Sequence, residues 1–217
     1  MKRFDKKLVG FLSRDEIQSI LDAPDTSTWC GQRDRVLLAT MYNTGARVSE
    51  IIGLRVSDIE FGQTPYVHIL GKGRKERTVP LWHTTTMRIK HWLPQIGASQ
   101  DQCLFPNRSG QAMTRPNVAN RLKHVIVSAG GQCPHLLSWA ISPHVIRHST
   151  AQHLLPSGVD LTVIALWLGH ESPVTTHMYM QTDLTMKERA LNTLHPPNTT
   201  AMRHRPPDRL LQFLASL

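Results

Sequence analysis

Hydrophobic residues along this chain recur mainly at helical spacing. The first such stretch places Ile17, Ile20 and Leu21 on one face, which is typical of an amphipathic helix packed against a core. Ser13 followed three residues later by Glu16 forms a capping box, so we expect this helix to begin directly after Ser13.

The same periodicity predicts most of the remaining elements. Helices are expected over residues 34–42, 47–54, 83–93, 114–129, 143–155 and 161–168. The interval 66–81 differs, because the short β-rich runs YVHIL and RTVPL flank a basic turn punctuated by glycine. This is the one convincing hairpin in the sequence. The predicted fold class is therefore mainly α with a small antiparallel β-sheet, an α+β arrangement.

Further elements are expected after Gly169, which ends the helix LTVIALWL. Ser172 and Pro173 can open a helix that carries Tyr179, and a further helix is expected from Asp183. Residues 195–208 are rich in proline and polar side chains, which indicates an extended linker. Residues 209–217, RLLQFLASL, form a final apolar helix candidate. We therefore expect one folded domain over 1–194, a linker and a terminal helix.

Charge and cysteine usage narrow the class of protein. The 217 residues carry a formal net charge of +9 and a sequence pI near 9.9, which favours a polyanionic partner such as nucleic acid. The three cysteines are widely spaced and in no CxxC arrangement, so neither a disulfide framework nor a zinc site is indicated. No secretory signal or membrane-spanning run is evident. We expect a cytoplasmic protein.

Four motifs carry a more specific signal. They are TGARVSE at 44–50, GKGRKERTVPL at 71–81, HVIRH at 144–148 and LGHESPVTTHMY at 168–179. Together, and in this order, they resemble the tyrosine recombinase (phage integrase) family, in particular the catalytic domain of its XerC/XerD-like members. The resemblance implies a DNA breaking and rejoining enzyme that needs neither metal nor ATP.

Two arginines match the catalytic arginines of that family. Cleavage of a phosphodiester without a metal needs cationic side chains on the non-bridging oxygens, and the planar guanidinium fork pairs with two oxygens while staying protonated. Arg47 and Arg147 occupy the matching positions. Most arginines of a basic protein are ordinary surface or ion-paired residues, and only the surrounding motifs favour the catalytic interpretation.

The hairpin turn holds the candidate general acid. Lys72 matches the family lysine that protonates the leaving 5′ hydroxyl, and a turn can carry its ammonium into the minor groove. Lys75 cannot be excluded by position, but the GKG context favours Lys72. Lys75, Arg74 and Arg77 are expected to contact DNA phosphates, although Arg74 and Arg77 can instead pair with acidic residues. An ordinary solvated turn is the alternative interpretation.

The remaining reactive groups are two histidines and a tyrosine. His144 stands three residues before Arg147, so both lie on one helical face and can converge on one phosphate. By resemblance His144 accepts the tyrosine proton, His170 hydrogen-bonds the scissile phosphate, and Tyr179, nine residues after His170, is the nucleophile. A phenol has a pKa near 10 and attacks poorly without such neighbours.

Auxiliary and structural roles fall to other residues near the motifs. Glu50 is expected to orient an arginine or a histidine through an ion pair, with a plain charge near a helix start as the alternative. Two further histidines, His148 and His153, are assigned to structure. The apolar positions expected to form the core around the site are Leu54, Ile146, Leu154, Leu155, Val163, Ile164 and Leu168, together with Trp167.

The resemblance also implies a course of reaction. Tyr179 would form a 3′-phosphotyrosyl adduct, and a 5′ hydroxyl from a partner strand would resolve it, which gives strand exchange through a Holliday junction in a homotetramer on double-stranded DNA. Members of the family usually carry a helical core-binding domain before the catalytic one, which is absent from this sequence. We favour its removal from this chain over a minimal recombinase.

Three alternatives stay open at this point. A type IB topoisomerase-like enzyme would use the same chemistry to relax supercoils, and a basic DNA-binding regulator would use no nucleophile. Residues 209–217 can dock onto a neighbouring protomer or fold back onto their own domain. The target DNA sequence and the biological role, whether integration, excision, transposition or dimer resolution, are not encoded in any pattern we can interpret.

Overall fold

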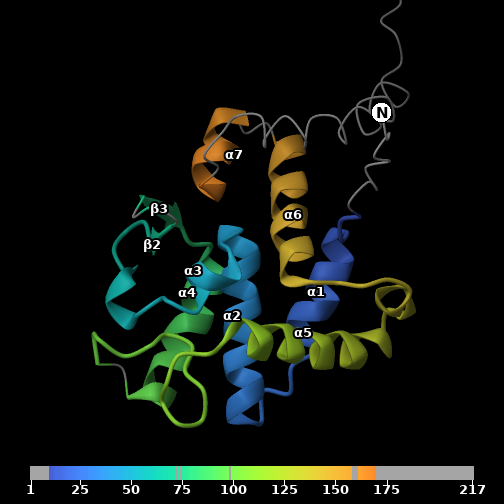
Figure 1. Ribbon diagram of the computed structural model, residues 1–217, viewed down its shortest axis with the longest axis horizontal. Helices are drawn as coiled ribbons and strands as arrows, with labels where there is room; N and C mark the ends of the chain where they lie inside the picture. Colours follow the sequence, from blue (N-terminus) through green and yellow to red (C-terminus); the bar gives the residue numbers. More distant parts are fainter. Residues whose placement is uncertain (1–9, 72, 74, 98, 158–160, 170–217) are drawn as a thin grey trace, which may run out of the picture. The chain divides into compact units, whose positions relative to one another are not determined.

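The computed structural model describes residues 10–71, 73, 75–97, 99–157 and 161–169 (Figure 1). The chain divides into two compact units, residues 1–181 and 182–217, and every described residue belongs to the first. No helix within the described ranges is long and apolar enough to cross a membrane.

Seven α-helices and three strands are described. They are α1 (Arg14–Asp22), α2 (Trp29–Thr44), α3 (Val48–Ile51), β1 (Ile59–Glu60), β2 (Tyr66–Leu70), β3 (Glu76–Pro80), α4 (His83–Trp92), α5 (Arg115–Gly130), α6 (Pro143–Leu154) and α7 (Leu161–Leu168). Short 3₁₀ turns cover Val56–Asp58, Leu93–Ile96, Pro134–Leu137 and Leu155–Ser157. The predicted fold class, mainly α with a small antiparallel sheet, is confirmed.

The predicted helix starts agree closely with the structure. The Ser13 hydroxyl accepts from the Glu16 amide, and the Glu16 carboxylate accepts from the Ser13 amide, so the capping box is present. Helix α2 begins five residues earlier than predicted, because Thr28 caps it and the continuous apolar run used for the prediction starts only after Asp34. Ser142 is the N-cap of α6 but makes no side-chain capping bond.

The sheet is one strand larger than the predicted hairpin. Strands β2 and β3 pair antiparallel with Val67 opposite Val79, and the two-residue strand β1 adds to the other edge of β2. Alternate residues of β2 and β3, Val67, Ile69 and Val79, are buried, while the residues between them face outward. A strand as short as β1 is too brief to leave an alternating pattern.

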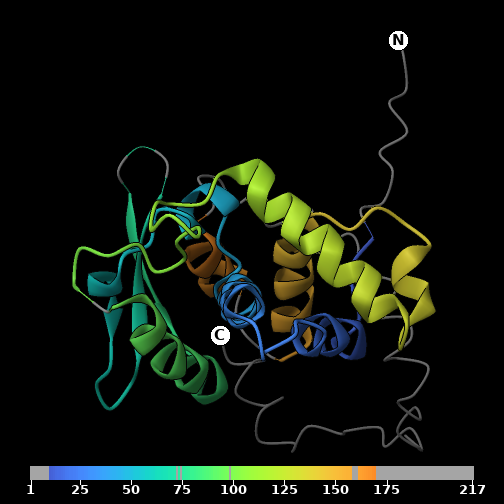
Figure 2. The same cartoon turned by 90° about the horizontal axis from the view of Figure 1, so that it is seen from below.

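Helix α2 is the centre of the helical part, in contact with α1, α4 and α6 (Figure 2). Its side chains are buried on nearly all sides, which explains the lack of a clear polar face in its sequence. It ends at Gly45, whose φ of 58° lies in the left-handed region that favours glycine. This turn brings the first motif next to α6 and α7.

Helix α7 packs against α6 and strand β3 through one face only. Ile164 and Leu168, four residues apart, are fully buried with Ala151 of α6. The expectation that Val163 belongs to the core is wrong, since its side chain is 46% exposed and projects from the other face of the helix. Leu54 and Ile146 are buried as predicted, and Leu154 and Leu155 are half-buried.

Candidate active site

The carboxyl end of α7 is the point where the motifs meet. The helix stops at Gly169, which has a φ of 64°, and its last carbonyls have no partner within the helix. Three guanidinium groups donate to three consecutive carbonyls: Arg77 to Trp167, Arg147 to Leu168 and Arg47 to Gly169. Carbonyl ends of helices carry partial negative charge, so cations are favoured here.

Arg47 is the N-cap residue of α3 and is placed by its own helix. Its amide donates to Glu50 Oε2 at 2.8 Å, and its Nη1 donates to Glu50 Oε1 at 3.0 Å. Its Nη2 reaches the Gly169 carbonyl at 3.3 Å. The side chain is nevertheless 40% exposed, so this guanidinium is fixed on one side and open to solvent on the other.

Arg147 lies on the buried part of α6. One nitrogen, Nη2, donates to the Leu168 carbonyl at 2.8 Å, and the other, Nη1, donates to the Gly45 carbonyl. The residue is 4% exposed. Its position therefore depends on the turn after α2 and on the end of α7, two segments that are far apart in the sequence.

Glu50 holds two arginines with one buried carboxylate. Besides Arg47, it accepts from Nη2 of Arg77 at 2.7 Å, and its side chain is 4% exposed. Burial alone would raise the pKa of this carboxyl, but the hydrogen bonds from Arg77 and Arg47 outweigh it and the net pKa is lowered. Glu50 thus pairs with Arg47 and also accepts from the amide at the start of α3, a geometry compatible with both interpretations of this residue, and its role in the site stays a prediction.

His144 stands at the start of α6, three residues before Arg147. Partial burial of the ring lowers its pKa, and the positive charges of Arg147 and Arg47 lower it further. The residue as a whole is exposed, so water still reaches the ring from one side. An imidazole in this field is neutral near pH 7 and can accept a proton.

Two hairpin residues predicted to contact DNA, Lys75 and Arg77, differ in their exposure to solvent. Lys75 is exposed just before β3, which suits a phosphate contact. Arg77, in contrast, points inward: its side chain is 10% exposed and its Nε donates to the Trp167 carbonyl at 3.0 Å. Of the two roles expected for Arg77, the geometry favours the pairing with an acid.

Four predicted site residues lie outside the described residues. They are Lys72, Arg74, His170 and Tyr179. The described chain ends at Gly169, directly before His170, and includes both sides of Lys72 at Gly71 and Gly73. Their roles therefore stay predictions.

Residues outside the predicted set also shape the site. The Gly45 backbone approaches α7 so closely that a Cβ there would lie 2.4 Å from Leu168 Cδ2. Asn43 is buried: its Nδ2 donates to the Pro80 carbonyl, its Oδ1 accepts from the Trp82 amide, and its carbonyl accepts from Trp167 Nε1. These contacts join α2, the end of β3 and α7. The sequence predicted that this helix ends at Tyr42, whereas α2 continues to Thr44 and places Asn43 in its last turn. The partners of Asn43 in distant segments were not visible in the sequence.

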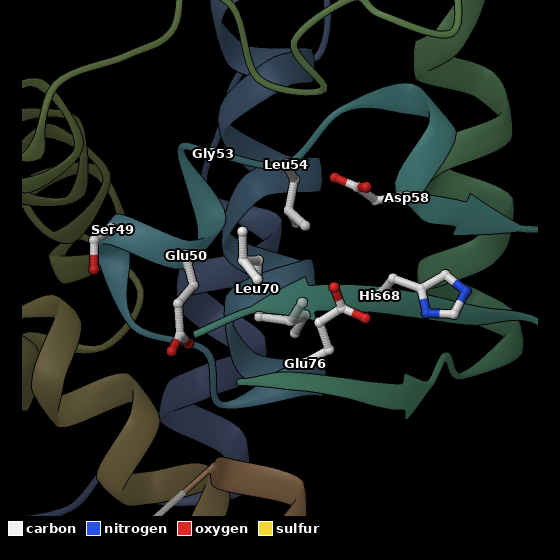
Figure 3. Close-up of a pocket in the computed structure, with 9 residues that line it drawn as sticks. Ser49, Glu50, Gly53, Leu54, Asp58, His68, Leu70 and Glu76 are labelled. Atoms are coloured by element: carbon white, nitrogen blue, oxygen red, sulfur yellow. The ribbon is translucent and has the colours of Figure 1, made fainter. Parts of the chain in front are cut away.

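A cavity of about 580 Å³ lies on the other side of Glu50, between α3 and strand β2 (Figure 3). Its rim carries the carboxylates of Glu50, Asp58 and Glu76, with His68 at one end. Neither Arg47 nor His144 lines it. Clustered carboxylates repel a phosphate, so this cavity is not where the two predicted catalytic arginines would receive DNA.

Residues 10–186 match the family model described as the phage integrase family, which covers most of the chain and all four motifs. The chain belongs to the phage integrase family. The resemblance inferred from the motifs is thereby confirmed, including the likeness to XerC and XerD. Tyrosine recombinase XerD of Yersinia pestis is 37% identical over 201 residues, 90% of this chain and 64% of the relative.

Another relative and two solved structures agree with this assignment. A putative integrase/recombinase, y4rC, of Sinorhizobium fredii is 42% identical over 216 residues, 100% of this chain and 65% of the relative. The XerH site-specific recombinase in a post-cleavage complex with its difH substrate superimposes with a TM-score of 0.73 at 27% identity, over 86% of this chain and 54% of that one. XerA recombinase, at 22% identity over 85% of this chain and 66% of that one, shares the fold with a TM-score of 0.70. The chain spans slightly less than two thirds of the two relatives' lengths, 65% and 64%.

Proposed function

We propose that this protein is a site-specific DNA recombinase that cuts and rejoins DNA through a 3′-phosphotyrosyl intermediate at Tyr179. The observation that carries the proposal is the convergence of Arg47 and Arg147, from separate elements, on the adjacent carbonyls of Gly169 and Leu168. The two guanidinium groups bring positive charge to one helix end, where Arg47 keeps a side open to solvent from which a phosphate can approach. Membership of the phage integrase family supports the same conclusion.

The proposed reaction divides the work among the site residues. The Tyr179 oxygen attacks the scissile phosphorus and gives its proton to His144, whose ring is neutral near pH 7 because of its surroundings. Arg47 and Arg147, with His170, stabilise the charge on the non-bridging oxygens. The bond to the 5′ oxygen breaks as Lys72 protonates that oxygen. Attack by another 5′ hydroxyl reverses these steps and releases Tyr179.

The substrate and assembly form part of the proposal. The solved XerH complex holds a DNA substrate, which supports double-stranded DNA as the partner of this chain. We infer a homotetramer that exchanges strands through a Holliday junction and acts in the cytoplasm. Residues 209–217, outside the described residues, would dock onto a neighbouring protomer. Deletion of this segment should weaken assembly on DNA and spare single-strand cleavage, and unchanged assembly would exclude the docking role.

A nicked suicide substrate tests the chemistry directly. A duplex selected by the protein from a randomised pool, nicked beside the scissile phosphate, should trap a covalent adduct that survives denaturation. The adduct should vanish in Tyr179→Phe and persist in Tyr66→Phe, a matched change on strand β2. An adduct in Tyr179→Phe would show that another residue is the nucleophile. Joined sites, rather than relaxed circles alone, would separate recombination from topoisomerase activity.

A further inference from the structure

The three arginines at the end of α7 are not equivalent. Arg47 and Arg147 belong to the motifs expected to face the phosphate, whereas Arg77 comes from strand β3 and reaches the same helix end from the side of the sheet. Its Nε lies 3.0 Å from the Trp167 carbonyl, one residue before the carbonyl that Arg147 holds. Arg77 therefore ties the hairpin to α7.

The contacts of Arg77 leave it little freedom to reach DNA. Its side chain is 10% exposed, and it lies in register with Ile69 on the neighbouring strand. Gly169 packs directly against it, because a Cβ on Gly169 would lie 2.9 Å from Arg77 Nη1 and 3.2 Å from its Cδ. Burial alone does not separate Arg77 from Arg147, but Arg77 is paired with a buried carboxylate, whereas Arg147 donates to the backbone carbonyls of Gly45 and Leu168. Moving Arg77 to a phosphate would leave the Glu50 charge buried without this partner, which is costly.

Arg77 also acts on Arg47 through Glu50. Oε2 of Glu50 accepts from Nη2 of Arg77 and from the Arg47 amide, while Oε1 accepts from Nη1 of Arg47. The position of the Glu50 carboxylate is thus set by Arg77 on one side and sets Arg47 on the other. Partners of this kind fix the orientation of the groups that touch substrate.

We propose that Arg77 is a positioning residue that does not touch DNA. It holds Glu50, Arg47 and the end of α7 in a fixed position relative to one another. Arg47 and the chain leading to His170 can then face the same phosphate. This inference rests on the function proposed above for Arg47 and His170. It replaces the phosphate contact first expected of Arg77 with an internal role.

Salt dependence of DNA binding separates the two roles. We would measure affinity of the full chain for a random-sequence duplex across a salt series, comparing Arg77→Gln with Lys75→Gln, an exposed neighbour on the same hairpin. Loss of a phosphate contact lowers the slope of log affinity against log salt by about one. Lys75→Gln should lower it, and Arg77→Gln should leave it unchanged. An equal drop in both variants would overturn the proposal.

A second measurement reports the environment of Glu50 directly and does not require that the protein cleave DNA. Carboxyl carbon NMR should show the pKa of Glu50 rising in Arg77→Gln, because its principal hydrogen-bond partner is removed, and staying in place in Lys75→Gln. Should wild-type protein form no Tyr179 adduct, the proposed chemistry fails while this measurement still decides whether Arg77 holds Glu50. An unshifted Glu50 in Arg77→Gln contradicts the inference.

Cleavage by the full chain completes the test. Single-turnover adduct formation on the selected nicked duplex should fall about 10- to 100-fold in Arg77→Gln at saturating DNA, the range seen when an orienting partner is lost. Arg77→Lys keeps the charge beside Glu50 but not the fork that also reaches Trp167, so it should recover part of the rate. It also provides a folded variant if Arg77→Gln does not fold. Full activity in both variants would refute the positioning role.

Discussion

Within the described ranges, two carboxylate–arginine units can be compared, each a buried carboxylate held by two arginines. In one, Glu50 pairs with Arg47 and Arg77. In the other, Asp34 of α2 pairs with Arg33 at 2.8 Å and with Arg121 of α5 at 2.6 Å. Both carboxylate side chains are almost fully buried, at 4% and 1% exposed. The chemistry of the pairs is alike, so the difference in role must come from their surroundings.

The surroundings of the two units differ in the positive charge that remains available to bind a ligand. Each unit has one buried arginine, Arg33 at 5% or Arg77 at 10% exposed, and one part-exposed arginine, Arg121 at 37% or Arg47 at 40%. Arg33 also donates to the Pro106 carbonyl and stacks over Trp29. Arg47 is 40% exposed and stands beside Arg147, and the charges of both reach His144. A carboxylate with two arginines stabilises a fold, and the open side of Arg47 beside a third arginine, Arg147, makes the Glu50 unit a candidate phosphate site.

The largest expected effect comes from removing the Asp34 charge. Asp34→Asn leaves Arg33 buried without its counter-charge, and loss of one partner of a buried pair costs about 3–5 kcal/mol of stability. Glu50→Gln should also cost stability, because it leaves Arg77 buried without its counter-charge, but it alone should slow cleavage per folded molecule. Urea unfolding and single-turnover cleavage of both variants measure the contrast. An equal loss of cleavage rate per folded molecule in the two variants would mean that the two units are not distinguished as described.

The next effect concerns the third arginine. Arg147→Lys removes the fork that spans the carbonyls of Gly45 and Leu168, and loss of one preorganised donor to a transition state lowers the rate about 10²- to 10³-fold. The matched change Arg33→Lys should lower stability and leave the cleavage rate per folded molecule unchanged. Adduct formation on the nicked duplex provides the rate. A similar rate loss in Arg33→Lys would show that stability alone controls activity.

A smaller effect is expected at the turn that supports Arg147. Gly45→Ala places a side chain at a φ of 58°, which costs about 1–2 kcal/mol, and its Cβ must also displace Leu168 of α7. Gly110→Ala, at a φ of 78° with nothing within 4 Å, carries the backbone cost alone. The difference in unfolding free energy between the two isolates the contact with α7. No difference would show that Leu168 moves aside freely.

Sequence patterns predicted the parts of this molecule that depend on neighbours along the chain. The capping box at Ser13, the hairpin and the helix stop at Gly169 each follow from a few adjacent residues. Glu50 was expected, from its place in the RVSE motif, to pair with an arginine or a histidine, and it lies 3.0 Å from Arg47. Local periodicity and turn chemistry carry this kind of information.

Contacts between distant segments could not be predicted in the same way. Arg77 meets Trp167 across 90 residues, and nothing near either residue indicates the partner. The Asp34 unit joins α2 to α5 and was missed because Arg33 and Asp34 read as the ordinary polar start of a helix. Val163 was assigned to the core from its apolar character alone, whereas a short helix that packs through one face exposes it.

The smallest expected effect is a shift in the pKa of His144. It tests the influence of Arg47, whose side chain is open to solvent on one side. Burial and the charges of Arg147 and Arg47 lower the pKa of His144 in the folded protein, so the ring stays neutral as pH falls through about 6.5, the ordinary histidine value. If His144 accepts the Tyr179 proton, cleavage should hold steady through this range and decline only at lower pH, where the ring becomes charged. Arg47→Gln removes one of the repelling charges, so the His144 pKa should rise toward its ordinary value; because Arg47 is itself proposed to hold the phosphate, this variant is followed by the titration of the ring and not by cleavage. Arg33→Gln, in the Asp34 unit, should leave the His144 titration in place. Proton NMR of the ring gives the pKa directly, and a His144 that titrates at or above 6.5 in the wild-type protein would rule out this account of its environment.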